Sequence, residues 1–263
     1  MLLIGWDVGI KNLSYCVIEY KDNNYTIRDW NIIDLRYENE DEEKQYILES
    51  LKKANKLEEK AKAKAKSKAK AKAKADAKAG AKTEDNDNDI DLNSKDNAKS
   101  KAKAKAKTKK CSKISLKDLS RNLYKKLEQN NNFSNFDYVI IENQPVLKNP
   151  TMKSIQMILY SYFSFKSLSL ENFKDLILMS ASNKLKVYKD EIDTEEMEKI
   201  NKLKSKYSRN KKISILHTKL LLNEHEYNAK TWFDFFNNNK KKDDLADSFL
   251  MILYYLKKNK LIK

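Results

Sequence analysis

The sequence predicts an α/β domain built on a mixed sheet with helices on its faces. Near the N-terminus, three successive runs rich in β-branched and aromatic residues are separated by short turns containing Gly, Asn and Asp, at residues 2–8, 13–20 and 25–35. Further along the chain, short apolar runs alternate with helical periodicity, which makes the order βββαβαβα. An antiparallel meander of three strands that feeds parallel crossovers gives a five-stranded mixed sheet flanked by helices.

Periodicity and length define the elements after the meander. Leucine and isoleucine residues spaced for one helix face predict a helix over 114–129. Residues 137–142 are a short, nearly all-apolar strand, as expected for a strand covered on both faces. The remaining elements are a helix, a strand, a charged connector and two final helices, at 151–168, 174–179, 187–208, 209–224 and 243–258.

Residues 52–113 differ in composition from the rest of the chain, because they alternate Lys and Ala around an acidic patch. This segment has 22 lysines against 9 acids, and the other residues have 32 bases against 29 acids, so most of the net charge of +16 is local. With almost nothing to bury, the segment cannot offset its ordering entropy. We expect a disordered low-complexity insert, with a dedicated binding arm as the alternative, in a single domain formed by 1–51 and 114–263.

Several features predict a soluble, intracellular protein. No apolar run approaches the roughly 18 residues of a membrane span, and the N-terminus lacks the pattern of a secretory signal. The chain contains two cysteines, Cys16 and Cys111, and two histidines, His217 and His225. These are too few for a zinc cage or a disulfide framework.

Scarce glycines and prolines surround two carboxylates at strand ends. Gly5 and Gly9 flank Asp7, which lies in an otherwise apolar strand, where a buried carboxylate needs a cation to neutralise it. Glu142 closes the apolar run 138–141 and is followed by both prolines of the chain. For each residue, the alternative is a carboxylate that faces water at the edge or end of a strand.

A further acidic group opens the last predicted helix. Asp244 and Asp247 are three residues apart and share one helix face, whereas Asp243 points about 100° away from Asp244. Favourable interaction with the helix dipole explains one of these acids. It does not explain Asp247, which interrupts apolar positions that would otherwise be buried.

These carboxylates can converge at one end of the predicted sheet. Four convergent carboxylates without His or Cys form an oxygen-rich site suited to Mg²⁺ or Mn²⁺. Two such ions can activate a water and stabilise both the attacking and the leaving oxygens of an in-line displacement at phosphorus. The predicted chemistry is therefore phosphodiester hydrolysis.

Four segments resemble the RuvC-type Holliday junction resolvases, in the branch of poxviruses and other large DNA viruses, which is related to fungal mitochondrial resolvases. They read IGWDVGIKNL, IIENQP, NPTMKSIQ and KKDDLAD, at residues 4–13, 140–145, 149–156 and 241–247. The resemblance covers nearly all of 1–51 and 114–258. The insert and the long connector 187–208 depart from it.

The resemblance implies an RNase H-like fold, a homodimer and magnesium-dependent paired incisions in four-way DNA junctions, in recombination, repair and replication of DNA; Mn²⁺ is expected to substitute. Its four acidic ligands fall on Asp7, Glu142, Asp244 and Asp247, with Asp243 as a neighbour. If the protein is viral, it would act where viral DNA replicates in the host cell.

Lysine greatly outnumbers arginine, which favours contact with DNA shape and backbone over reading of sequence. The predicted phosphate contacts are the lysines placed near the carboxylates: Lys11, Lys184, Lys186, Lys211, Lys212, Lys241 and Lys242. For each of them the alternative is a solvated surface lysine. Asn143 and Gln144 either contact DNA or support the positions of the acidic side chains.

The predicted helix 151–168 is apolar over more than the ~100° stripe needed to face one sheet. Core packing explains part of this coverage. Together with the resemblance, the excess suggests a dimer interface, which two symmetric cuts would require.

Two other functions remain open. An RNase H-like nuclease that acts on RNA–DNA hybrids or flaps would have the same acidic site. A non-catalytic basic DNA-binding protein on the same fold is the other alternative, and the presence of all four acids argues against it.

Overall fold

The computed structural model describes residues 1–39, 41–53, 55–56, 59, 114–147, 149–187, 194–224 and 229–262. The chain divides into two units, one formed by Met1–Glu38 with Lys110–Lys263 and one by Asn39–Lys109. The second unit contains a helix over residues 41–53. The predicted disorder of 52–113 concerns residues almost all outside the described ones and stays a prediction; Cys111 and His225 also lie outside them.

The first unit contains the five-stranded mixed sheet that the sequence predicts. Its strands are β1 (Leu2–Asp7), β2 (Leu13–Lys21), β3 (Asn24–Ile33), β4 (Tyr138–Glu142) and β5 (Asp175–Met179). Their order is β3-β2-β1-β4-β5. The pairs β1–β2 and β2–β3 are antiparallel, whereas β1–β4 and β4–β5 are parallel. The predicted five-stranded mixed sheet, with three antiparallel strands followed by parallel crossovers, is therefore confirmed.

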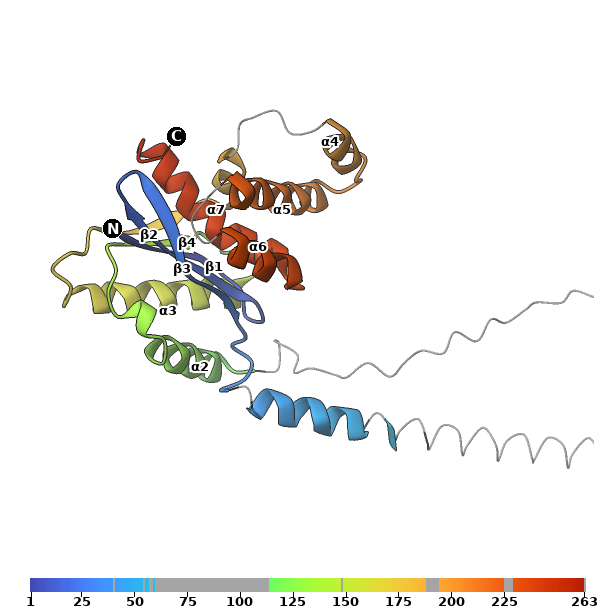
Figure 1. Ribbon diagram of the computed structural model, residues 1–263. Coiled ribbons are helices and arrows are strands. Elements are labelled where there is room, and N and C mark those ends of the chain that lie inside the picture. Colours follow the sequence, from blue (N-terminus) through green and yellow to red (C-terminus); the bar gives the residue numbers. More distant parts are fainter. Residues whose placement is uncertain are drawn as a thin grey trace, which may run out of the picture. The chain divides into compact units, whose positions relative to one another are not determined.

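Helices cover both faces of this sheet (Figure 1). One face carries α5 (Lys206–Glu224), α6 (Ala229–Asn238) and α7 (Lys242–Lys258), and the other carries α2 (Leu116–Glu128) and α3 (Pro150–Ser167). Side chains of β1 alternate between the two cores, with Leu3 in the core under α7 and Ile4 and Trp6 in the core under α2 and α3. This alternation decides the face on which each functional side chain lies.

Helix α7 lies unusually close to the strands beneath it. A Cβ atom at Gly5 would stand 2.5 Å from the carbonyl oxygen of Ser248, so only glycine allows this approach. The Ser248 hydroxyl also exchanges a buried hydrogen bond of 2.9 Å with the Ser14 hydroxyl of β2. The Trp30 indole of β3 donates to the Leu245 carbonyl oxygen at 3.1 Å. Helix α7 is therefore fixed against three strands.

Two regions contain more helix than the sequence predicts. The charged connector includes α4 (Thr194–Asn201), and α5 begins at Lys206, within the predicted connector. Aromatic residues before the last helix form α6, where Phe236 stacks on Trp30 with ring centroids 5.4 Å apart. Charged α4 and α5 carry few apolar residues in their first turns, so hydrophobic periodicity does not reveal where they begin. In the described part of the chain, no helix has the length and apolar character to cross a membrane.

Candidate active site

Asp7 and Glu142 lie side by side at one edge of the sheet. Each is the last residue of its strand, and β1 and β4 are parallel neighbours that pair Trp6 with Ile141. The alternation of side chains places both carboxylates on the face that α7 covers, since Leu3 and Ile140 on these strands belong to that core. Asp7 is only 8% exposed and Glu142 9%. The alternative of water-facing carboxylates is therefore excluded.

The two carboxyl groups form a hydrogen bond with each other. Burial raises the pKa of Asp7 well above its usual value, and the negative charge of Glu142 and the hydrogen bond to it raise it further. Both effects favour the protonated form of the Asp7 carboxyl.

Helix α7 brings two more carboxylates to the same place. Burial and then the nearby charge of Asp243 raise the pKa of Asp244 to about 6. Burial also raises the pKa of Asp247, although the positive charge of Lys184 opposes this shift. One carboxylate oxygen of each, Oδ2 of Asp244 and Oδ1 of Asp247, is buried without a hydrogen-bond partner among the described residues.

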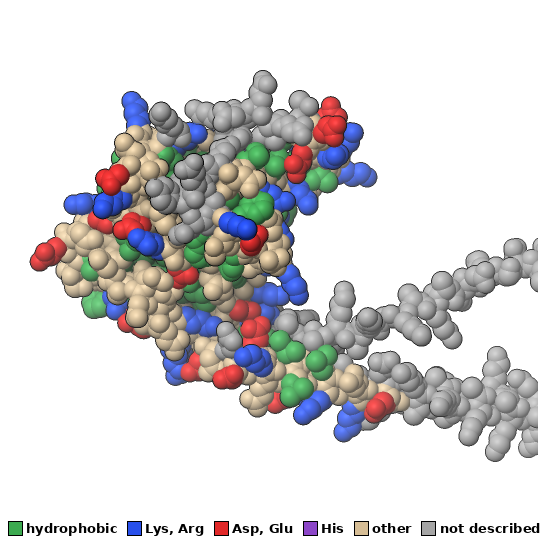
Figure 2. All heavy atoms as spheres, in the orientation of Figure 1, with side chains coloured by type: hydrophobic (Ala, Val, Ile, Leu, Met, Phe, Trp, Pro, Cys, Tyr) green, Lys and Arg blue, Asp and Glu red, His purple; other side chains and the backbone are tan. Residues whose placement is uncertain are grey.

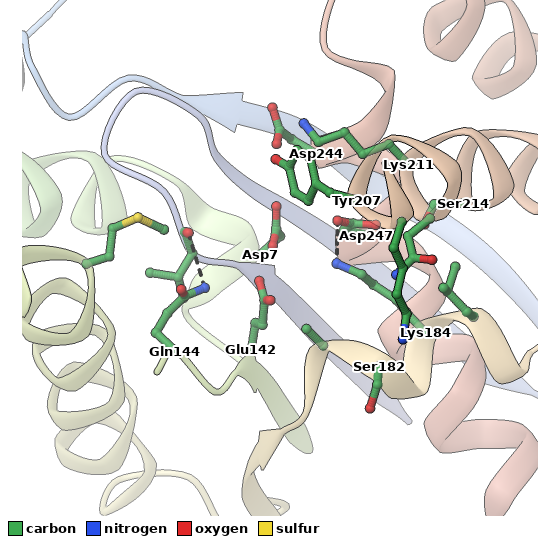
Figure 3. A pocket seen from close by; sticks show the side chains of 16 residues that line it. Asp7, Glu142, Gln144, Ser182, Lys184, Tyr207, Lys211, Ser214, Asp244 and Asp247 are labelled. Carbon is green, nitrogen blue, oxygen red and sulfur yellow. Dashed lines mark hydrogen bonds and ion pairs between the residues drawn. The ribbon is translucent and has the colours of Figure 1, made fainter. Parts of the chain in front are cut away.

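A cavity of about 500 Å³ joins the four carboxylates (Figure 3). Helix α5 forms another wall of it, and the short 3₁₀ helix η3 (Ala181–Lys186), which follows β5, also lines it. The side chains that matter most for its chemistry are Asp7, Glu142, Gln144, Lys184, Tyr207, Lys211, Ser214, Asp244 and Asp247.

Lys184 is the cation closest to the acids. Its ammonium forms an ion pair with Asp247 and is largely buried. Burial alone would lower the pKa of Lys184, but the charges of Asp247, Asp7 and Glu142 outweigh burial and raise it. The sequence predicts Lys184 as a phosphate contact, and the structure places it inside the acidic cluster.

The other predicted lysines are placed differently. Lys211 lines the cavity and pairs with Asp243, whereas Lys212, the next residue on the same helix, is exposed. Adjacent helical residues point about 100° apart, so only one of the two can face the cavity. Lys11, Lys186, Lys241 and Lys242 do not line it either, and their contacts with DNA stay predictions.

Asp243 faces away from the other acids. Its carboxylate pairs with Lys211 and does not line the cavity. Burial would raise its pKa, but the hydrogen bond from Lys211 outweighs burial and lowers the pKa of Asp243. This arrangement agrees with its assignment as a neighbour of the acidic set.

The start of α3 holds the loop that follows Glu142. The side-chain oxygen of Gln156, which is completely buried, accepts a hydrogen bond of 2.7 Å from the backbone N–H of Gln144. Lys153 donates both to Gln156 and to the Asn143 side-chain oxygen, at 3.1 and 3.0 Å. Gln144 itself lines the cavity. This clamp is not apparent from the sequence, because it joins Gln144 to a residue 12 positions further along the chain.

Helix α5 also contributes side chains to the cavity that the sequence alone does not indicate. Tyr207, Asn210 and Ser214 line the cavity from successive turns of this helix. Asn210 and Ser214 lie within the predicted helix 209–224, whereas Tyr207 lies in the predicted connector, and no feature of the sequence shows that these three residues face the acids. Their spacing of three and four residues is the one signal that places them on a common face.

The donor set fits a hard divalent cation better than any other metal, since all the carboxylates supply oxygen and two of their oxygens are buried without partners. As the side chains stand, however, no group of three or more His, Cys, Asp or Glu within the described ranges could hold a metal ion. Lys184 provides the local positive charge instead. Metal binding therefore stays a prediction.

Comparison with known proteins gives one sequence relative and several structural neighbours. No family model matches the chain. Uncharacterized protein L451 of Acanthamoeba polyphaga mimivirus is 40% identical over 147 residues, which are 53% of this chain and 34% of that protein. The chain therefore spans about a third of the length of this viral relative.

Two kinds of solved structure are similar in fold. The fowlpox virus resolvase in complex with Holliday junction DNA has a TM-score of 0.48 and 17% identity, over 98% of this chain and 99% of that one. The yeast mitochondrial Holliday junction resolvase Ydc2 has a TM-score of 0.48 and 16% identity, over 98% of this chain and 80% of that one. At such values the likeness extends to the fold at most, and the chemistry depends on the residues of the cavity.

Proposed function

We propose that this protein is a Holliday junction resolvase, an endonuclease that makes symmetric paired nicks in four-way DNA junctions. The observation that carries the proposal is the convergence of Asp7, Glu142, Asp244 and Asp247 in one cavity at the end of an RNase H-like sheet. The fowlpox and yeast proteins named above carry the same activity in their names.

The segments that resemble RuvC-type resolvases supply the four acids of this cavity, whereas η3 and α5 supply its other walls. Residues 4–13 end β1 and 140–145 end β4, while 241–247 open α7. Residues 149–156 open α3 and supply the clamp on the loop after Glu142. A resemblance confined to scaffold positions would not gather in this way around four acids.

The four carboxylates would hold one or two magnesium ions. Magnesium supplies a Lewis acid that activates water and stabilises the leaving oxygen of an in-line displacement at phosphorus. Lys184 neutralises part of the acidic charge and, released from Asp247, can bind a phosphate oxygen of the substrate. Gln156 and Lys153 keep Glu142 and its loop in position.

Paired nicks require two active sites, so the proposal includes a homodimer. Helix α3 offers the surface, because Met157 and Phe165 are exposed apolar residues on it. Lysine, arginine and acidic side chains are interspersed over the face of the first unit seen in Figure 2. This face therefore offers no broad basic surface, and the proposed DNA contacts are the lysines near the cavity.

The test incubates the purified protein with synthetic four-way junctions, flaps, RNA–DNA hybrids and duplexes, in Mg²⁺ or Mn²⁺. We expect symmetric nicks confined to the junction. Asp7→Asn should lower the rate of junction cleavage by at least about a hundredfold and leave junction binding in place. Asp22→Asn is the matched control, because Asp22 is exposed in the β2–β3 turn with a positive φ that asparagine adopts readily.

Each alternative function has its own outcome. Preferential cutting of RNA–DNA hybrids or flaps would mean that the protein is another RNase H-like nuclease and not a resolvase. Junction binding without cutting in either metal would favour the non-catalytic protein. Titration of Mn²⁺ followed by its paramagnetic resonance measures metal binding directly, and we expect Asp7→Asn to weaken it.

A further inference from the structure

Tyr207 is an exposed aromatic residue at the mouth of the acidic cavity. It lies in the first turn of α5 and is 69% exposed, although it lines the same cavity as Asp7 and Asp247. In Figure 3 it stands beside Asp244 and Lys211.

The ring of Tyr207 is held from one side. The ammonium of Lys211 lies 4.8 Å from the ring centroid, and the same ammonium pairs with Asp243 on α7. Lys211 therefore ties the ring to the helix that carries the acids. No other aromatic ring of the described residues pairs with Tyr207. A fixed ring with most of its surface open to solvent has the form of a stacking platform.

We propose that Tyr207 stacks on a nucleobase next to the phosphate held at the carboxylates. The inference rests on the proposed function and adds a determinant of specificity to it. Aromatic side chains bind exposed bases in this way with little preference for base identity. A base inside a continuous duplex has both faces covered by its neighbours, whereas a base at a branch point can be unstacked. Tyr207 would therefore favour branched DNA over continuous duplex.

The first measurement is photocrosslinking. A four-way junction carrying 5-iododeoxyuridine beside the cleavage site is irradiated with Asp7→Asn protein in Mg²⁺, so that the DNA stays intact. We expect the label on the peptide that contains Tyr207. Tyr124 provides the internal control, because it is 40% exposed on α2, across the sheet from the cavity.

The second measurement compares binding by variants in the same Asp7→Asn background. Tyr207→Phe should bind the junction as tightly as its parent, because it keeps the ring. Tyr207→Leu should bind the junction about tenfold more weakly and bind duplex unchanged. Tyr124→Leu should change neither affinity, and an unchanged melting temperature for every variant excludes unfolding.

The outcomes separate this inference from the proposed function. If the wild type cuts junctions but Tyr207→Leu binds them like Tyr207→Phe, or if the label lies elsewhere, the stacking role is wrong and the resolvase remains. Equal weakening for junction and duplex would also overturn it, because that result describes general affinity. If the wild type cuts no junction, both proposals fail together.

Discussion

Helices α7 and α3, on opposite faces of the sheet, differ in how much of their surface is buried. Helix α7 is buried on nearly every side from Leu245 to Leu256, and it carries acids only at its N-terminal turns. Helix α3 buries a stripe that includes Ile155 and Leu159 but leaves Phe165 72% exposed. Helix α7 is therefore enclosed by its own chain, whereas α3 keeps an apolar surface that the described residues do not cover.

The two helices also support the acidic cavity in different ways. Helix α7 supplies carboxylates directly, and Gly5 and Ser248 set its distance from β1. Helix α3 supplies no carboxylate and acts through Gln156, which holds the loop after Glu142. Close packing thus fixes Asp244 and Asp247 on α7, and polar contacts support the loop that follows Glu142.

The largest expected effect comes from separating α7 from β1. In Gly5→Ala, the new Cβ meets the Ser248 carbonyl oxygen at 2.5 Å, and this backbone atom cannot move without displacing the helix. We expect the free energy of unfolding to fall by about 3 kcal/mol, measured by urea denaturation. Ser161→Ala on the exposed side of α3 should change it by less than about 0.5 kcal/mol. Equal effects for the two variants would remove the contrast between the helices.

Replacing Asp244 on α7 should have a smaller effect on the free energy of unfolding, and it should raise this free energy instead of lowering it. The pKa of Asp244 is raised to about 6, so the folded state favours the protonated carboxyl. The stability that this residue contributes is complete below about pH 4 and is lost as the pH rises through 6. In metal-free buffer at pH 7, Asp244→Asn should therefore raise the free energy of unfolding by about 1 kcal/mol, after allowance for solvent screening.

Denaturation curves of wild type and Asp244→Asn at several pH values measure this difference. The gain should appear between about pH 4 and 6 and disappear in more acidic buffer. Asp22→Asn should show no such gain, since Asp22 is exposed in a turn. A gain that does not depend on pH would have a cause other than the charge of Asp244.

Local patterns predicted most of the sheet and the four acids. The strand ending in Asp7 and the strand ending in Glu142 are short apolar runs, and their parallel pairing places the two ends together. The i,i+3 spacing of Asp244 and Asp247 places both on one helix face. These features depend on neighbours in sequence and on rules of sheet topology.

What the sequence did not predict depends on contacts between distant elements. Lys184 could be recognised as basic, but its pairing with Asp247 depends on how η3 packs against α7. Tyr207 lies in a charged segment whose helix begins without an apolar pattern. Gln156 looks like one more polar residue until its hydrogen bond to Gln144 is known.

The smallest expected effect on stability comes from the exposed surface of α3. Phe165→Ser with Leu168→Ser removes two side chains that the described residues leave exposed. The free energy of unfolding of the monomer should change by less than about 0.5 kcal/mol. Burial of an aromatic side chain between two copies is worth about 2 kcal/mol, so the dissociation constant of the proposed dimer should rise at least about tenfold.

Sedimentation velocity over a range of protein concentrations measures this dissociation. Leu116→Ser is the control, because Leu116 is a partly exposed apolar residue at the start of α2 and lies outside α3. Loss of the dimer should convert paired nicks into single, uncoupled nicks, because each monomer keeps its own four carboxylates. If the α3 substitutions leave dimerisation unchanged but Leu116→Ser abolishes it, the interface lies at α2 and not at α3. Unchanged dimerisation in both variants would mean that neither surface joins the two copies.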